Sequence, residues 1–185
     1  VIEEENKLII NGNEVKIIYA NDPSKIDYTD HGIKNALLID NTGVWRTKEG
    51  LSTHLNCNGI SKVLLTAPAK EGIKNIVHGI NNGIIENDEI LGAASCTTNA
   101  IVPTLKVLND EFNIISGHIE SVHSYTNDQN LIDNFHKKAR RGRSAALNMV
   151  ITETGAGKAV GQVLPELIGK LTANAVRVPT PNVSL

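Results

Sequence analysis

The sequence lacks any long apolar run. Its hydrophobic stretches fall well short of the roughly 20 residues that a membrane-spanning helix needs, and its start shows no signal-peptide pattern. The net charge at pH 7 is only -2, so the chain also lacks the excess of positive charge that binds nucleic acids or acidic membrane surfaces. We therefore expect a globular cytoplasmic protein that binds neither nucleic acid nor a membrane.

Cysteine is scarce. Cys57 and Cys96 are the only two, and without a secretory context we expect two free thiols rather than a disulfide. No metal site is expected.

The chain also lacks an initiator methionine, an internal repeat and a low-complexity segment. It opens on Val1 and stops at Leu185, within a run that is typical of a strand. We interpret it as an internal piece of a longer protein. Its 185 residues suffice for one good core or two small ones.

Short β-rich runs separated by turns fill the first half of the chain. Residues 7–10 and 15–19 flank Asn11-Gly12-Asn13, and Asn-Gly adopts the positive φ angles of a tight hairpin turn. Further strands are predicted at residues 36–40 and 63–68 and within residues 84–94, with the first two runs buried, and a short helix is predicted between Thr47 and Asn56. This alternation predicts an α/β sheet whose carboxyl edge carries ligands.

The stretch Ser95-Cys96-Thr97-Thr98-Asn99 stands at a predicted helix start, because apolar residues follow at helical spacing: Ile101, Leu105, Leu108 and Phe112. Ser95 is then the N-cap and Cys96 the first helical residue. The unpaired N–H groups and the positive end of the helix dipole stabilise a thiolate there. A free cysteine is more often a small buried hydrophobe, but these polar neighbours favour a nucleophile.

A thiolate nucleophile needs a base, and His123 is the best candidate. It lies in a predicted strand over residues 117–126, in a polar setting that the other histidines lack. A lone histidine on a strand is more often structural. Its pairing with Cys96 reverses that preference, since an imidazole beside such a cysteine holds an ion pair and moves a proton.

A polar, basic loop follows over residues 127–143. It is too long for a mere connection, so we expect it to contact an anion or a neighbouring subunit, although a solvated charged face is the plainer alternative. A second helix is predicted from the turn at residues 154–160. A strand at residues 173–178 then brings Arg177 to its end.

Five motifs of the chain occur together and in a recognisable order. They are Ala94-Ser95-Cys96-Thr97-Thr98-Asn99, His123-Ser124-Tyr125-Thr126-Asn127-Asp128-Gln129, Arg140-Arg141-Gly142-Arg143, Thr154-Gly155 and Arg177-Val178-Pro179-Thr180-Pro181-Asn182-Val183. In order and spacing they closely resemble phosphorylating glyceraldehyde-3-phosphate dehydrogenase, and the resemblance covers essentially the whole chain. It implies the end of a doubly wound dinucleotide-binding (Rossmann) domain, residues 1–95, followed by part of an α+β catalytic domain, residues 96–185.

The resemblance also implies a role for each matching residue. Cys96 is the expected nucleophile that forms a hemithioacetal and then a thioester, and His123 is its base. Thr126, Asp128 and Arg177 are expected at the phosphate of glyceraldehyde 3-phosphate, with Asp128 orienting Arg177. The residues expected around the incoming inorganic phosphate are Ser95, Thr97, Arg141, Thr154 and Gly155, and Thr66 is expected near the cofactor.

The chain departs from this family in several places. The Gly-rich dinucleotide turn and the acidic residue that binds the adenosine ribose are absent from these residues, so NAD is implied by the resemblance alone. Asn21 and Asn134-Phe135 replace residues common in NAD-dependent members, which leaves NADP open. Glu153 places a negative charge beside a proposed phosphate site, and we expect it to point away.

Three alternatives stay open. One is erythrose-4-phosphate dehydrogenase, a relative that shares the cysteine and histidine motifs. Another is a cysteine hydrolase, since a Cys/His pair alone does not separate oxidation from acyl transfer to water. The third is a truncated copy without enzymatic activity. The family also implies a homotetramer, with the long loop packed against a neighbouring subunit's cofactor.

Overall fold

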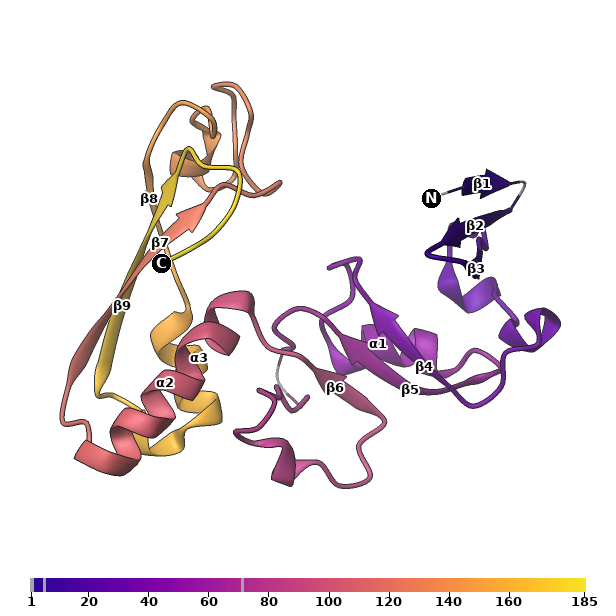
Figure 1. Ribbon diagram of the computed structural model, residues 1–185, viewed down its shortest axis with the longest axis horizontal. Coiled ribbons are helices and arrows are strands. Elements are labelled where there is room, and N and C mark those ends of the chain that lie inside the picture. The colour runs from indigo at the N-terminus through magenta and orange to yellow at the C-terminus, as the bar shows by residue number, and fades with distance from the viewer. Residues whose placement is uncertain (1, 5, 71) are drawn as a thin grey trace.

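The computed structural model describes residues 2–4, 6–70 and 72–185. At its amino-terminal end, β1 (Ile2–Glu4), β2 (Lys7–Ile10) and β3 (Asn13–Lys16) form a small antiparallel sheet (Figure 1). Asn11 and Gly12 have φ angles of 51° and 80° between β2 and β3. The predicted hairpin is therefore confirmed, with its second strand beginning at Asn13 rather than Val15.

A parallel sheet follows, in the order β4 (Ala36–Asp40), β5 (Ile60–Leu65) and β6 (Ile90–Gly92). The connection from β4 to β5 contains the predicted short helix, α1 (Lys48–Leu55), and the structure adds that Thr47 is its N-cap and Asn56 its C-cap. Leu51 of α1 packs with Val63 and Leu65 in a buried cluster. Three short 3-10 turns also lie in this half of the chain: η1 (Pro23–Lys25), η2 (Tyr28–His31) and η3 (Asn82–Ile84).

One face of β4 is not buried as predicted. Leu38 packs against the cluster around Leu51, whereas Leu37 and Ile39 are 55% and 53% exposed. Successive side chains of a strand point to opposite faces of the sheet, and α1 lies against only one of them. The apolar run therefore forms the expected strand, but only half of it contributes to the core within the described residues.

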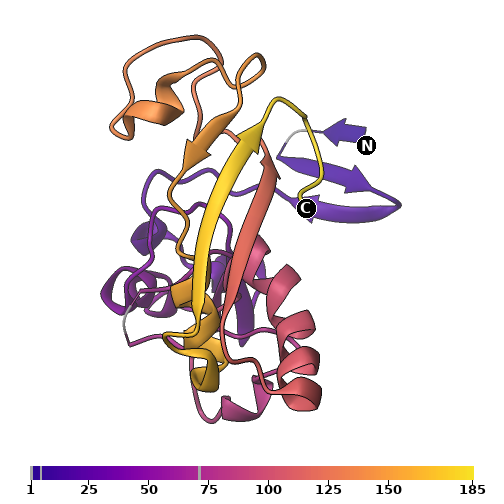
Figure 2. The ribbon, with the colours of Figure 1, turned by 90° about the vertical axis from the view of Figure 1, so that its left-hand side faces the viewer.

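The third sheet carries the second half of the chain, in the order β7 (Gly117–Ser124), β9 (Leu171–Val178) and β8 (Val150–Thr152). β7 and β9 are parallel, and β8 runs antiparallel to β9. Two helices pack against this sheet, α2 (Cys96–Phe112) and α3 (Ala156–Val163) (Figure 2). The short turn η4 (Ala139–Gly142) lies in the long loop, and η5 (Pro165–Leu167) follows α3.

The core between these helices and the sheet differs in part from the predicted helix face. Ile101 and Leu105 of α2 pack against the core as predicted, beside the fully buried Val102. Leu108 and Phe112 are exposed instead. Ile114, just beyond the end of α2, packs against the same cluster, so helical spacing alone does not decide which apolar residues are covered.

The predicted α/β class is confirmed, while the division at residues 95 and 96 stays a prediction. Backbone hydrogen bonds also join Leu185 to Val122 in both directions, which places the end of the chain beside β7. None of the helices described is long and apolar enough to cross a membrane.

The buried position of Val102 leads to a stability prediction. Val102→Ala should lower the free energy of unfolding by about 2 kcal/mol, because it opens a cavity in a closely packed core. Val107→Ala, the same change on the same helix, should stay within about 0.5 kcal/mol, because Val107 is 63% exposed and Val102 is 0% exposed. Urea unfolding of the complete protein measures both, and equal losses would contradict the assigned core.

Candidate active site

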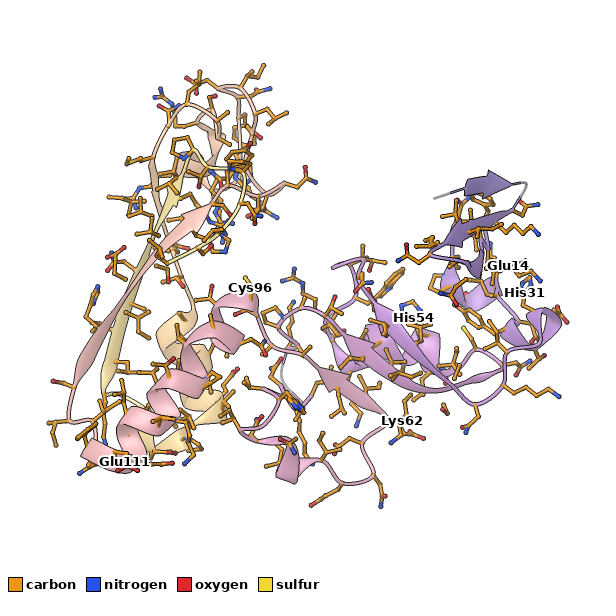
Figure 3. All side chains as sticks on the ribbon, in the orientation of Figure 1. Glu14, His31, His54, Lys62, Cys96 and Glu111 are labelled. Carbon is orange, nitrogen blue, oxygen red and sulfur yellow. The ribbon has the colours of Figure 1, made fainter. Side chains whose placement is uncertain are left out.

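Cys96 is the first residue of α2, as predicted. The Ser95 side chain caps the helix, since its Oγ accepts a hydrogen bond from the Thr98 N–H at 3.0 Å. The preceding residue, Ala94, has a φ of 57°, an angle that residues with a Cβ rarely adopt, so the chain turns sharply just before the helix. Cys96 lies at the end of α2 that is nearer to β6, with Glu111 at the opposite end (Figure 3).

His123, near the end of β7, faces the Cys96 thiol. Its Nε2 lies 3.6 Å from Cys96 Sγ. Its Nδ1 lies 2.7 Å from the Ser124 carbonyl oxygen, which can only accept a hydrogen bond. A neutral ring with its hydrogen on Nδ1 satisfies this carbonyl and leaves the Nε2 lone pair for the sulfur, which is the tautomer that a base for Cys96 needs. Arg177 Nη1, which can only donate, also lies 3.2 Å from Nδ1, so the guanidinium and the carbonyl oxygen compete for this nitrogen.

Arg177 lies beside His123 because β7 and β9 pair in parallel with these two residues in register. Its Nη1 donates to the Ser124 carbonyl oxygen at 3.2 Å and to Thr126 Oγ1 at 3.1 Å. Burial and the positive charge of Arg141 lower the pKa of Arg177, while Cys96 acts in the opposite direction. A bound anion would offset both of the unfavourable effects on the guanidinium.

Arg141 belongs to a second group of polar side chains. Its Nε donates to Thr152 Oγ1 at 2.9 Å, and its Nη1 contacts the carboxylate of Asp128. The prediction that Asp128 orients Arg177 is therefore wrong. The Asn130 N–H donates to the Arg141 carbonyl oxygen at 3.1 Å, and this fold of the loop brings Arg141 to Asp128.

A pocket of about 450 Å³ surrounds the thiol and the imidazole. The start of α2 and the start of α3 both contribute to it, and the first N–H groups of a helix attract anions. At α3 the Thr154 hydroxyl accepts a hydrogen bond from the Ala156 N–H at 3.1 Å. Seven of the predicted site residues line this pocket: Ser95, Cys96, Thr97, His123, Thr154, Gly155 and Arg177.

The other predicted site residues lie outside that lining. Arg141 lines a neighbouring pocket of about 380 Å³ with Lys137, Lys138 and Arg140. Thr126 and Asp128 contact the arginines, as described above. Thr66 follows β5, where its hydroxyl bonds to Asn41 Oδ1 at 2.8 Å, and Pro68 and Ala69, just beyond it, line the larger pocket.

Sequence reasoning missed Lys158 and Gln162, which also line the larger pocket. Lys158 lies in the first turn of the predicted second helix, close to Gly155, which was itself a predicted site residue. This proximity in sequence could have identified Lys158 as a candidate. Glu153, which we expected to point away, is among the residues that line both pockets. Glu153 belongs to the short connection, residues 153–155, between β8 and α3.

Residues 95–185 match the family described as glyceraldehyde 3-phosphate dehydrogenase, C-terminal domain. A glyceraldehyde-3-phosphate dehydrogenase-like protein of Pseudomonas aeruginosa is 66% identical over 184 residues, which cover 99% of this chain and 40% of that protein. The chain belongs to the glyceraldehyde-3-phosphate dehydrogenase family.

Two further relatives of this family have similar coverage. Glyceraldehyde-3-phosphate dehydrogenase 1 of Bacillus cereus is 43% identical over 187 residues, 100% of this chain and 55% of that protein. The chloroplastic glyceraldehyde-3-phosphate dehydrogenase A of Zea mays is 46% identical over 182 residues, 98% of this chain and 44% of that protein. The chain thus spans about half the length of the curated relatives it matches.

Cys57 provides a contrast to Cys96. Both thiols are free, as predicted, but Cys57 is buried and Cys96 is exposed. The Cys57 thiol donates to the carbonyl oxygens of Pro23 and Thr53 at 3.1 and 3.3 Å. Burial raises its pKa, with a further contribution from Asp22 and Asp27. In the described ranges, no group of three His, Cys, Asp or Glu side chains is arranged to hold a metal ion.

The two thiols should differ in reactivity. Near neutral pH, iodoacetamide should alkylate Cys96 and leave Cys57 largely unmodified, because a raised pKa leaves less reactive thiolate at a given pH. Raising the pH towards 10 should bring Cys57 into reaction. Mass spectrometry of peptides from the complete protein measures both sites, and equal labelling at neutral pH would contradict the contrast.

The His123 contact leads to a separate prediction. His123→Asn removes the base beside Sγ, so alkylation of Cys96 near neutral pH should slow by at least about tenfold. His118→Asn on the same strand is the matched control, because the His118 imidazole bonds to Thr172 instead. An unchanged rate in His123→Asn would remove His123 from the chemistry of Cys96.

Proposed function

We propose that the complete protein containing this chain is a phosphorylating dehydrogenase of the glycolytic type. It oxidises glyceraldehyde 3-phosphate to 1,3-bisphosphoglycerate in the presence of inorganic phosphate and NAD or NADP. The observation that carries this proposal is the 3.6 Å contact of Cys96 with His123 inside a pocket lined by Arg177. Cysteine and histidine supply covalent chemistry, and the arginine supplies affinity for a phosphorylated substrate.

The first half of the reaction forms a thioester on Cys96. His123 Nε2 takes the thiol proton, the thiolate adds to the aldehyde carbon, and the imidazolium returns the proton to the aldehyde oxygen, which gives a neutral hemithioacetal and a neutral His123. When bound, the nicotinamide cofactor accepts the hydride that leaves this carbon. His123 takes the hydroxyl proton in the same step, which restores the carbonyl as a thioester.

The second half transfers the acyl group to inorganic phosphate. A phosphate oxygen attacks the thioester carbon, the carbon–sulfur bond breaks, and the Cys96 thiolate leaves. We assign the substrate phosphate to Thr126 and Arg177, and we assign Asp128 to orienting Arg141, its ion-pair partner. The incoming phosphate is assigned to the start of α2, the start of α3 and Arg141, which includes the predicted residues Ser95, Thr97, Thr154 and Gly155. A hydrolase has no use for this second anion site.

The residues present fit a nicotinamide cofactor at one edge of the parallel sheet. Thr66 stands just past the carboxyl end of β5, where open α/β sheets bind dinucleotides, and Pro68 and Ala69 connect that edge to the pocket of Cys96. Thr66 is the residue of this chain that we assign to cofactor binding. The Gly-rich turn of such sites is not among these 185 residues, and the choice between NAD and NADP is left to experiment.

We also propose a cytoplasmic homotetramer. Leu131, Phe135 and Leu147, in and just after the long basic loop, are exposed large apolar side chains. Such a concentration on a surface loop is typical of a protein contact. A neighbouring subunit is the partner that we assign to it.

Turnover of the complete protein tests the proposed function. With glyceraldehyde 3-phosphate and NAD or NADP, reduced cofactor should form continuously only when inorganic phosphate is present, and absorbance at the reduced-cofactor band measures it. Cys96→Ser should abolish turnover because hydroxyl is a poor nucleophile here, whereas Cys57→Ser should retain most of it.

Other outcomes would point elsewhere. Faster turnover of erythrose 4-phosphate would favour the related dehydrogenase. Thioester or ester cleavage without any cofactor reduction would indicate a cysteine hydrolase. Absence of turnover together with an unreactive Cys96 would indicate a copy without enzymatic activity.

A further inference from the structure

Glu153 occupies a position that the proposed chemistry does not use. It lies between Thr152, the last residue of β8, and Thr154, which precedes the Gly155 cap of α3. It lines the pocket that contains Cys96 and also the neighbouring pocket that contains Arg141. An acidic residue is therefore shared by the linings of the two pockets that carry the predicted anion ligands.

The Glu153 carboxylate is not neutralised by a close partner. Within residues 2–4, 6–70 and 72–185, its side chain makes no ion pair and no hydrogen bond, and the residue is exposed. Arg141, a predicted phosphate ligand that lines the second pocket, is already paired with Asp128. Lys158 lines the Cys96 pocket together with Glu153 and supplies a positive charge there.

An anion in the Cys96 pocket meets opposing charges. Arg177, Lys158 and the N–H groups at the start of α3 attract it, whereas the Glu153 carboxylate repels it. Because Glu153 is exposed, water and salt screen the repulsion in part. The affinity for a small doubly charged anion depends on the difference between this attraction and this repulsion. An uncharged residue in place of Glu153 would remove the repulsion and raise the affinity.

We propose that Glu153 is a specificity-determining residue that weakens the binding of inorganic phosphate in the Cys96 pocket. The assignment of phosphate as the acyl acceptor rests on the proposed function. The consequence is a high requirement for phosphate in the second half of the reaction. Phosphate binding itself is measurable without turnover, because an anion in this pocket shields Cys96 from alkylation.

The first experiment measures protection of Cys96 in the complete protein. Iodoacetamide labels Cys96 at increasing concentrations of inorganic phosphate, and the concentration that halves the rate is compared between proteins. Glu153→Gln should lower that concentration by at least about threefold, and Glu153→Asp, which keeps the charge, should stay closer to the unmodified protein. Glu166→Gln is the matched control, because Glu166 is exposed on η5 and lines neither pocket.

A salt series separates a charge effect from a structural one. The difference between Glu153→Gln and the unmodified protein should shrink as KCl rises from about 50 mM to about 500 mM, since salt screens exposed charges. A rearranged pocket would not show this dependence. The KM for phosphate in turnover should fall in parallel with the protection value.

The outcomes distinguish the inference from the proposed function. Equal protection by phosphate in Glu153→Gln and the unmodified protein, or no protection in either, would overturn the role of Glu153. Normal protection that responds to Glu153→Gln, without phosphate-dependent turnover, would support Glu153 and overturn the proposed reaction instead. Salt-independent differences would assign Glu153 to structure alone.

Discussion

The parallel pairing of β7 with β9 is the interaction on which the site depends. It sets His123 and Arg177 side by side, and the Ser124 carbonyl oxygen accepts hydrogen bonds from both side chains. The same backbone oxygen thus holds the orientation of the imidazole and the position of the guanidinium. In the roles that we propose for them, an imidazole and a guanidinium held in this way need little rearrangement when a substrate arrives.

The helices α2 and α3 position the Cys96 thiol in the pocket. α2 and α3 begin at the same pocket, and Val102 and Val160 bury their contact in a common core. The Ser95 cap and the sharp turn at Ala94 then present the Cys96 thiol to His123. The packing of this core therefore holds Cys96 Sγ close to His123 Nε2.

Charge is distributed unevenly around this geometry. Arg177 is surrounded by neutral oxygen acceptors and lies near a second guanidinium, whereas Arg141 has a carboxylate of its own. The pocket is thus left with positive potential that an anion can satisfy. Glu153 moderates that potential from the junction with the neighbouring pocket. Affinity for a phosphate group follows from the sum of these groups rather than from any single ligand.

Several turns, helix starts and helix caps of this protein were predictable from its sequence. The Asn-Gly hairpin, α1 between Thr47 and Asn56, and the Ser95 cap all depend on a few neighbouring residues, whose conformational preferences are present in the unfolded chain. The motifs around Cys96 and His123 indicated the nucleophile and its base for the same reason, since residue type and position at an element end carry that chemistry.

Tertiary structure alone decided the remaining contacts. Asp128 contacts Arg141 rather than Arg177, Glu153 lines the pocket, and Leu37 is exposed on an apolar strand. Each of these depends on how a loop folds back or on which element covers a face, and both are set by contacts between residues far apart in the chain. Sequence patterns describe a residue and its neighbours, whereas burial and pairing depend on what the rest of the chain places against them.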